Sequence, residues 1–116
     1  ISDVAILQTD LPFSTALEAD YRELSQGESV VVWGSPKYDH DSTIHRTRVE
    51  IVANRKHLGF PRIVVNAPII EGNSGGPVID SNGKVVGIAA TGQSAIDGDN
   101  QVINGFIPIS SLDTIT

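Results

Sequence analysis

The sequence predicts an all-β fold, and the distribution of its apolar residues leads to that expectation. Short apolar runs rich in Val and Ile recur along the whole chain, separated by Gly, Pro, Asn and Asp. Some runs alternate apolar and polar positions while others are apolar throughout, a mixture that favours a closed or sandwiched sheet. The 116 residues suffice for one domain with a modest core. The predicted strands cover residues 3–7, 29–33, 44–53, 62–66, 77–80, 84–90 and 102–109.

The most definite local element is a hairpin centred on residues 81–83, which read Ser-Asn-Gly. Asn and Gly adopt the positive φ angles of a tight turn at little cost. Apolar runs at residues 78–80 and 84–88 flank the turn on both sides. These two runs are therefore expected to pair as neighbouring antiparallel strands.

Helical signals are confined to two regions. Leu17, Tyr21 and Leu24 recur at helical spacing and Gly27 could cap a helix, but an extended linker fits these residues equally well. The end of the sequence, residues 110–113, is typical of the first turn of a helix with a serine N-cap. We see no internal repeat and no low-complexity segment.

Composition and charge exclude several classes of function. The net charge of -6 and a sequence pI of about 4.8, with scattered cations, argue against a nucleic-acid partner. The absence of cysteine excludes disulfides, thiolate metal sites and cysteine nucleophiles. No apolar run is long enough to cross a bilayer. The stretches at residues 39–41 and 97–100 are better explained as turns than as metal sites, and no cofactor is expected.

The strongest chemical signal is the loop at residues 72–77, which reads Gly-Asn-Ser-Gly-Gly-Pro. A serine hydroxyl is a poor nucleophile unless a base removes its proton and donors receive the oxyanion. The glycines beside Ser74 lack a Cβ atom, so the backbone can turn sharply and aim successive N–H groups at one point. Pro77 suits the first position of a strand. The loop therefore predicts a nucleophilic serine.

This loop matches the Gly-x-Ser-Gly-Gly-Pro signature of chymotrypsin/trypsin-like serine peptidases, and the Asn before the serine resembles the HtrA/Deg and glutamyl-endopeptidase branches. Other segments stand in the family's order: residues 2–7 resemble the strand that opens with the triad aspartate, and residues 27–36 the first strand of the second barrel. Residues 83–88 and 105–109 resemble the strand after the serine and the strand closing the specificity pocket.

The resemblance implies an antiparallel Greek-key β-barrel of the trypsin-like type, the second barrel of a two-barrel peptidase. It assigns residues 1–26 to the last strand of the first barrel and the inter-barrel linker. It assigns residues 27–116 to the C-terminal barrel that carries the nucleophile loop. The implied activity is peptide-bond hydrolysis through a serine acyl-enzyme, in an extracytoplasmic bacterial setting that the sequence itself does not settle.

The resemblance also assigns catalytic roles. Ser74 would attack the scissile carbonyl, and Asp3 would orient the base and stabilise its charged form. The N–H groups of Gly72 and Ser74 would form the oxyanion hole, each worth about a hundredfold or more in rate.

Substrate-binding roles follow in the same way. Ala90, Thr91 and Gly92 would pair with the main chain of an extended substrate. Pro68 falls near the base of the primary pocket, and Gly105 would leave its wall open. Because neither residue carries a charge, the resemblance implies a small or medium apolar side chain before the cleaved bond.

The catalytic histidine is the part of the family pattern that this sequence does not supply. The family's order is His, Asp, Ser, whereas His40, His45 and His57 all lie between Asp3 and Ser74 and are better explained as structural or exposed residues. We therefore expect a fragment, nearly inactive alone, with an exposed face that docks the missing barrel or a second copy. The alternative is a non-catalytic peptidase-like barrel that binds extended peptides by strand addition.

Other serine layouts fit less well. The Gly-x-Ser-x-Gly elbow of α/β-hydrolases leads into a helix and is followed by a histidine, whereas Pro77 leads into a hairpin and no histidine follows Ser74. The order Asp, His, Ser is that of subtilisin, but the alternation of strands and helices that such a fold needs is missing. A structural β-domain whose glycine loop is only a turn is a third possibility.

Overall fold

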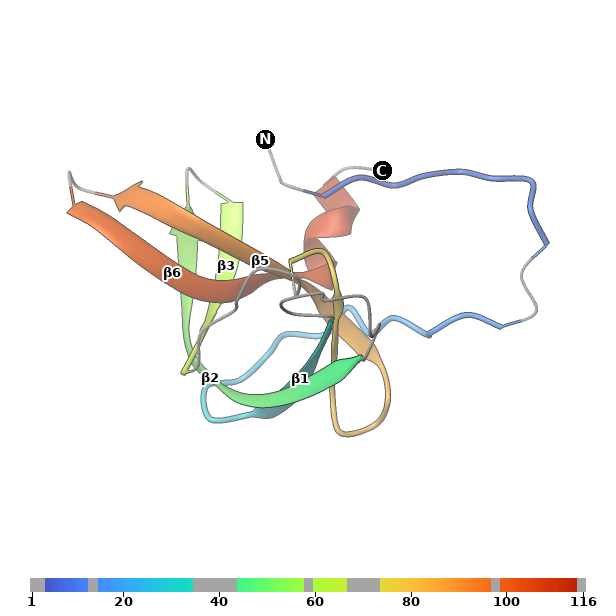
Figure 1. The fold of residues 1–116 in the computed structure, drawn as a ribbon, viewed down its shortest axis with the longest axis horizontal. Helices are drawn as coiled ribbons and strands as arrows, with labels where there is room; N and C mark the ends of the chain where they lie inside the picture. The colour runs from blue at the N-terminus through green and yellow to red at the C-terminus, as the bar shows by residue number, and fades with distance from the viewer. Residues whose placement is uncertain are drawn as a thin grey trace.

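The computed structural model describes residues 4–12, 15–34, 44–57, 60–66, 74–96 and 99–114. Within these residues, six strands form a closed antiparallel barrel in the order β1-β2-β3-β6-β5-β4, which confirms the predicted all-β barrel (Figure 1). The elements are β1 Ser29–Gly34, β2 His45–His57, β3 Phe60–Val65, β4 Pro77–Ile79, β5 Val85–Ile96, β6 Asp99–Pro108 and the 3₁₀ helix η1 Ile109–Thr114. None of the described helices is long and apolar enough to cross a membrane.

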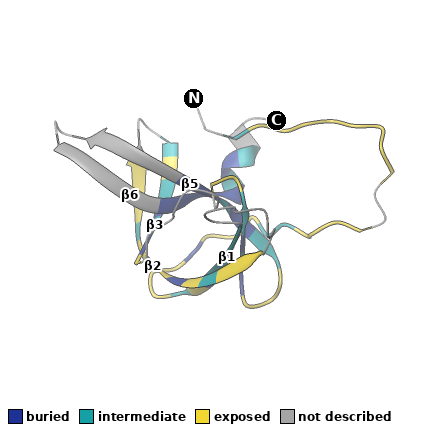
Figure 2. Ribbon diagram, viewed as in Figure 1, coloured by how far each residue is buried: buried dark blue, intermediate teal, exposed yellow. Residues whose placement is uncertain are grey.

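The core follows the alternation of the strands. Val30 and Val32 of β1 are fully enclosed while Val31, between them, faces outward and is half-buried. Figure 2 shows the buried residues concentrated where the strands close on one another. The largest enclosed side chain is Phe106, which is 0 % exposed. The core cluster comprises Leu24, Val30, Val32, Val49, Ile51, Ile63, Val65, Val78, Val86, Ala89 and Phe106.

Strand β2 serves two neighbours in succession. Its first half pairs with β1, from Gly34↔His45 to Ser29↔Glu50. Its second half pairs with β3, from Ile51↔Val65 to His57↔Phe60, and the register of this pairing shifts between Ile51 and Ala53. Such a bulge bends a strand and increases its twist, which is how β2 contributes to both sides of a small closed barrel.

The hairpin predicted at residues 81–83 is confirmed. β4 and β5 pair antiparallel across it, and Gly83 has a φ of 79°. Each run predicted between residues 29 and 109 also falls on a strand, although β2 and β5 extend further than their apolar runs. Cross-strand hydrogen bonds to β3 and β6 account for this extension, because a paired strand tolerates polar residues.

The strand expected at residues 3–7 is absent over its described part, residues 4–7. Residues 4–12 arch away from the barrel in Figure 1 and make no described strand pairing. Ile6 and Leu7 are 53 % and 89 % exposed. A strand forms only where another strand satisfies its backbone groups, and the described part of the chain offers none here.

Residues 15–24, which we call the strap, are extended rather than helical. Ala19 and Val85 form a parallel bridge, in which the Asp20 N–H donates to the Val85 carbonyl at 2.9 Å and the Val85 N–H donates to the Glu18 carbonyl at 2.8 Å. These bonds to the start of β5 replace the intrahelical bonds that residues 17–24 would have made. Gly27, with a φ of 89°, lies in the turn before β1 instead of capping a helix.

Candidate active site

The candidate nucleophile lies where the chain enters β4. Ser74 is exposed and occupies a turn that is followed closely by this strand. Gly75 has a φ of 89°, a conformation that residues with a side chain rarely adopt. The Gly75 N–H donates to the Ala89 carbonyl at 2.8 Å, and the Ala89 N–H donates to the Gly76 carbonyl at 2.9 Å. These two bonds fasten the turn to β5, so the serine precedes a hairpin and not the helix of an α/β-hydrolase elbow.

The edge of β5 is open beyond this turn. β4 and the turn cover one edge of β5 as far as Ala89, and no described strand continues along it. The opposite edge pairs with β6 from Gly87 to Ile96. An open strand edge beside a nucleophile turn can hydrogen-bond the main chain of a peptide. Ala90, Thr91 and Gly92, the residues predicted to pair with substrate, lie at the start of this open edge.

Gly105 has a steric reason to be glycine. It lies on β6 opposite Ala90 and also pairs with Val64 of β3. A Cβ atom on this residue would lie 2.1 Å from the Ile63 carbonyl oxygen and 3.0 Å from the Ile63 carbonyl carbon. The close approach of β3 and β6 therefore excludes any side chain here. The role of Gly105 in the wall of a specificity pocket stays a prediction.

The remaining predicted site residues, Asp3, Gly72 and Pro68, lie outside the described residues. Of the eight predicted positions, five are described, and the turn and pairings above bring Ser74 and Ala90 to one region of the barrel. No group of three or more potential metal ligands occurs among the described residues. The convergence of a triad and an oxyanion hole on Ser74 stays a prediction.

Residues 1–88 match the family described as the trypsin-like peptidase domain. The chain belongs to this family. The segment that matches includes the turn at Ser74, β4 and the first residues of β5, so the motif and the described geometry of the nucleophile region support the same conclusion.

Relatives place this trypsin-like peptidase domain in the HtrA branch. It is 39 % identical over 93 residues to a probable periplasmic serine endoprotease DegP-like of Pseudomonas putida, covering 75 % of this chain and 19 % of that protein. It is 35 % identical over 96 residues to the mitochondrial serine protease HTRA2 of Bos taurus, covering 76 % of this chain and 21 % of that protein. The chain thus spans about a fifth of the length of these relatives.

Solved structures agree with the barrel. The HtrA-type protease AlgW with tripeptide has a TM-score of 0.68 and 26 % identity, covering 93 % of this chain and 37 % of that one. AlgW with decapeptide has the same TM-score and identity, covering 91 % of this chain and 34 % of that one. The active form of the Rv3671c protease from M. tuberculosis, at 24 % identity and a TM-score of 0.62 over 84 % of this chain and 45 % of that one, shares the fold.

On the other side of β4, the peptidase domain carries a pair that the sequence did not single out. Trp33 of β1 lies opposite Arg46 of β2, and the Arg46 guanidinium stands 5.3 Å from the centroid of the Trp33 ring. This distance allows a cation–π interaction. The indole Nε1 is enclosed without an acceptor among the described residues, and an unsatisfied buried donor costs about 1–3 kcal/mol. One feature of the sequence could have indicated this pair: the single Trp of the chain lies in one predicted strand, and Arg residues alternate at the start of the next predicted strand.

A network of charged side chains ties the strap to the β4–β5 hairpin. The side chain of Asp80, 0 % exposed, accepts hydrogen bonds from the N–H groups of Asn82 and Lys84, both at 2.9 Å. It also accepts one from Arg22 at 3.1 Å. Arg22 in turn donates to both carboxylate oxygens of Glu28. The network fixes the turn of the hairpin and the path of the strap, and nothing in the sequence pattern predicted it.

This network shifts the pKa values of its members in the directions that stabilise the charged forms. Burial opposes ionisation of Asp80, but hydrogen bonds from the Lys84 N–H and from Arg22 outweigh it and hold the pKa of Asp80 below its ordinary value. Hydrogen bonding to Arg22 likewise lowers the pKa of Glu28. The two carboxylates raise the pKa of Arg22, which stays charged. The carboxylates are therefore ionised at neutral pH.

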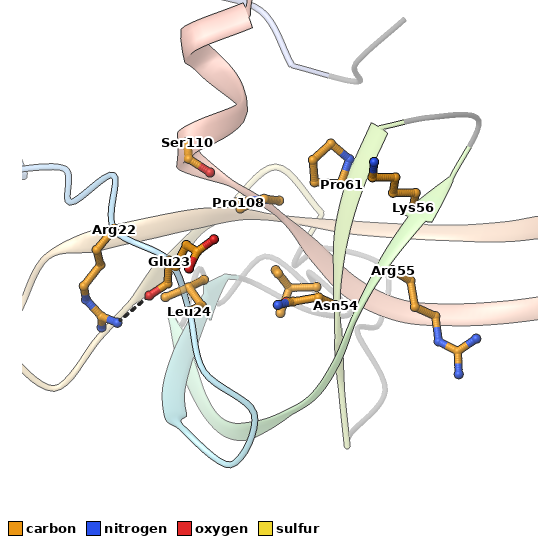
Figure 3. A pocket seen from close by; sticks show the side chains of 10 residues that line it. Arg22, Glu23, Leu24, Asn54, Arg55, Lys56, Pro61, Pro108 and Ser110 are labelled. Carbon is orange, nitrogen blue, oxygen red and sulfur yellow. Dashed lines mark hydrogen bonds between the residues drawn. The ribbon is translucent and has the colours of Figure 1, made fainter.

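A separate hollow of about 320 Å³ lies between the strap, the ribbon formed by β2 and β3, and the start of η1. Figure 3 shows Leu24, Pro61 and Pro108 around it, while the side chains of Arg22 and Arg55 point away from its centre. None of the five described residues with a predicted catalytic or substrate-binding role contributes to it. Its lining residues are Arg22, Glu23, Leu24, Asn54, Arg55, Lys56, Pro61, Ile63, Pro108 and Ser110.

Proposed function

We propose that the chain supplies the nucleophile barrel of a serine endopeptidase, which cleaves polypeptides through an acyl-enzyme on Ser74. The observation that carries the proposal is the turn in which exposed Ser74 precedes a left-handed Gly75 and is fastened to Ala89 of β5. A serine held in this way, at the start of an open strand edge and in a chain of this family, is placed to meet the carbonyl of a bound peptide.

The proposed catalytic groups are divided between this chain and residues outside it. Ser74 attacks the carbonyl, and the N–H groups of Gly72 and Ser74 receive the oxyanion. Asp3 orients a histidine that residues preceding Ile1 contribute, and this histidine takes the serine proton and later gives it to the leaving amine. Without that base the chain is nearly inactive, since loss of the triad histidine costs about a millionfold in turnover in subtilisin.

The proposed substrate is an extended polypeptide. Its main chain adds to β5 at Ala90, Thr91 and Gly92, where the strand edge is open. AlgW, a similar protein, has been solved with a tripeptide and with a decapeptide, which supports peptide binding by this barrel type. Pro68 and Gly105 form a small uncharged pocket for the side chain before the scissile bond.

In this proposal residues 1–26 form the linker and, where the first barrel supplies a strand to pair with, the last strand of that barrel, and residues 27–116 form the C-terminal barrel. Exposed apolar side chains in residues 4–12 support it, because apolar surface of this kind is covered when a partner binds. Ile6, Leu7 and Leu11 are 53 %, 89 % and 69 % exposed. We expect the isolated chain to self-associate through these apolar side chains or to capture the missing barrel, and light scattering that shows a monomer at high concentration would contradict this.

The test of catalysis uses a longer polypeptide that includes the residues preceding Ile1. A fluorophosphonate probe should label Ser74 there, and Ser74→Ala should abolish the labelling. His45→Ala is the matched control, because His45 is an exposed histidine on β2 without a catalytic role in the proposal. Absence of labelling, when a histidine is present in the preceding segment, would refute the peptidase proposal.

A non-catalytic peptide-binding barrel is the second candidate. The open edge of β5 favours it, because strand addition there needs no chemistry at Ser74. The two candidates give different results with the same probe. Peptide binding without fluorophosphonate labelling of Ser74 supports the binding barrel, whereas both together support the peptidase.

A further inference from the structure

A substrate on β5 cannot continue along that strand past the turn. Beyond Ala89, no described strand pairs with this edge of β5. At Ala89 the edge is occupied by the hydrogen bonds to Gly75 and Gly76, and from Ile88 to Val85 by β4. The interior of the barrel is filled by the core. In the proposed function, residues after the scissile bond therefore leave the β5 edge and cross the outer face of the sheet.

The strand order defines which residues this part of the substrate would contact on the outer face. Going away from β5, β4 is followed by β1 and then by β2. The strand register places Arg48, Val31 and Ile79 in one row across these three strands, and Arg46 and Trp33 in the next row. Val31 and Trp33 alternate with buried residues of β1, so both rows lie on the outer face.

The rows end in two positive charges. Arg46 and Arg48 are exposed, and neither forms an ion pair with a described residue. The chain is acidic, with a net charge of -6, yet five of its eight Lys and Arg residues lie on β2 and β3. Trp33 holds the Arg46 guanidinium over its ring, which orders this cation without neutralising it. An ordered, unpaired guanidinium fits a carboxylate well.

We propose that Arg46 and Arg48, with Trp33 beneath, form a subsite for acidic side chains on the leaving side of the substrate. Two strand spacings, about 10 Å, separate β4 from β2. An extended peptide advances about 3.3 Å per residue, so Asp or Glu at the third or fourth position after the scissile bond reaches the two guanidinium groups. The inference rests on the proposed function and names its substrate class: polypeptides with acidic residues downstream of an apolar residue.

Trp33 is the only tryptophan, so its fluorescence reports on the subsite directly. The probe is the capped peptide Ac-Ala-Ala-Val-Ser-Ala-Glu-Glu-NH2, compared with a twin in which Gln-Gln replaces Glu-Glu. The Glu peptide should perturb Trp33 fluorescence and bind about three- to tenfold more tightly, the range expected for two exposed ion pairs. The difference should shrink at about 0.5 M salt, where the Debye length is only a few ångströms.

Variants distinguish binding at this subsite from a general attraction between the peptide and the positive charges of the chain. Arg46→Gln and Arg48→Gln should each reduce the preference for the Glu peptide, and Arg46→Lys should retain most of it. Arg55→Gln is the matched control, because Arg55 is exposed on the same strand but lies beyond the bulge, opposite Arg62. Circular dichroism spectra should be the same for all variants.

The outcomes distinguish this inference from the proposed function. Equal binding of the two peptides, including no binding of either, overturns the subsite, and so does an equal effect of Arg55→Gln and Arg46→Gln. Ser74→Ala should leave the preference unchanged, because binding does not need the nucleophile. If the Glu peptide is preferred but Ser74 is not labelled by the fluorophosphonate in the longer polypeptide, the subsite is supported as part of a binding barrel. Only the peptidase proposal is then refuted.

Discussion

The turn at Ser74 can be tested by adding one methyl group at each of two glycines. Gly75 and Gly83 have φ angles of 89° and 79°, and a Cβ atom on either residue would meet nothing within 4 Å. Alanine at each site therefore introduces backbone strain and no steric clash. This strain costs about 1–2 kcal/mol. Gly75→Ala and Gly83→Ala should each lower the free energy of unfolding by that amount, measured in urea by Trp33 fluorescence.

The two substitutions should differ in their effect on the nucleophile. A residue at position 75 can relieve its strain only by moving the turn that two hydrogen bonds hold to Ala89. That movement displaces Ser74, and a displacement of about 1 Å can cost a hundredfold in rate. In the longer polypeptide, Gly75→Ala should slow fluorophosphonate labelling at least about tenfold, while Gly83→Ala, at the opposite end of β4, should label at the wild-type rate. Equal labelling rates for the two variants would refute the assignment of Ser74.

Three further predictions concern the free energy of unfolding of the chain in urea. Asp80→Ala removes a buried acceptor of three hydrogen bonds and should cost about 3–4 kcal/mol; a cost below about 1 kcal/mol would contradict the network. The pKa values of Asp80 and Glu28 are lowered by folding, so the unfolded state takes up protons first as the pH falls. The stability that these two carboxylates contribute should be complete above about pH 5 and be lost as the pH falls through their lowered pKa values. If Asp80→Asn lost as much stability over this pH range as the wild type, this prediction would be contradicted. Gly105→Ala should cost about 3 kcal/mol or prevent folding, because its Cβ atom would lie 2.1 Å from the Ile63 oxygen, and wild-type stability would exclude this close approach.

The sequence predicted the barrel well because its information is local. Val30 and Val32 alternate with outward residues, and the Asn82-Gly83 turn fixes the pairing of the strands beside it. Each of these signals depends only on residues that are close in the sequence, so it can be recognised without the structure. The motif around Ser74 was predictable for the same reason.

Long-range contacts were not predictable in this way. The apolar residues of the strap, between residues 17 and 24, have helical spacing, but the strap's backbone hydrogen bonds are made with Val85. Arg22 reaches Asp80 across 58 positions of the chain, and no periodicity reports such a contact. The strand expected at residues 3–7 failed over residues 4–7 for a related reason, since apolar composition predicts a strand only where another strand is present to pair with it.

The short length of β4 explains the arrangement of the described part of the candidate site. β4 spans only Pro77–Ile79, whereas its neighbour β5 continues to Ile96. Where β4 ends, no described strand pairs with this edge of β5, and the turn that carries Ser74 occupies the boundary. In our proposals, a peptide adds to the β5 edge on one side of this boundary and crosses the outer face of β4, β1 and β2 on the other. In the proposed function, the point at which strand pairing stops therefore places the nucleophile and separates the two halves of a bound substrate.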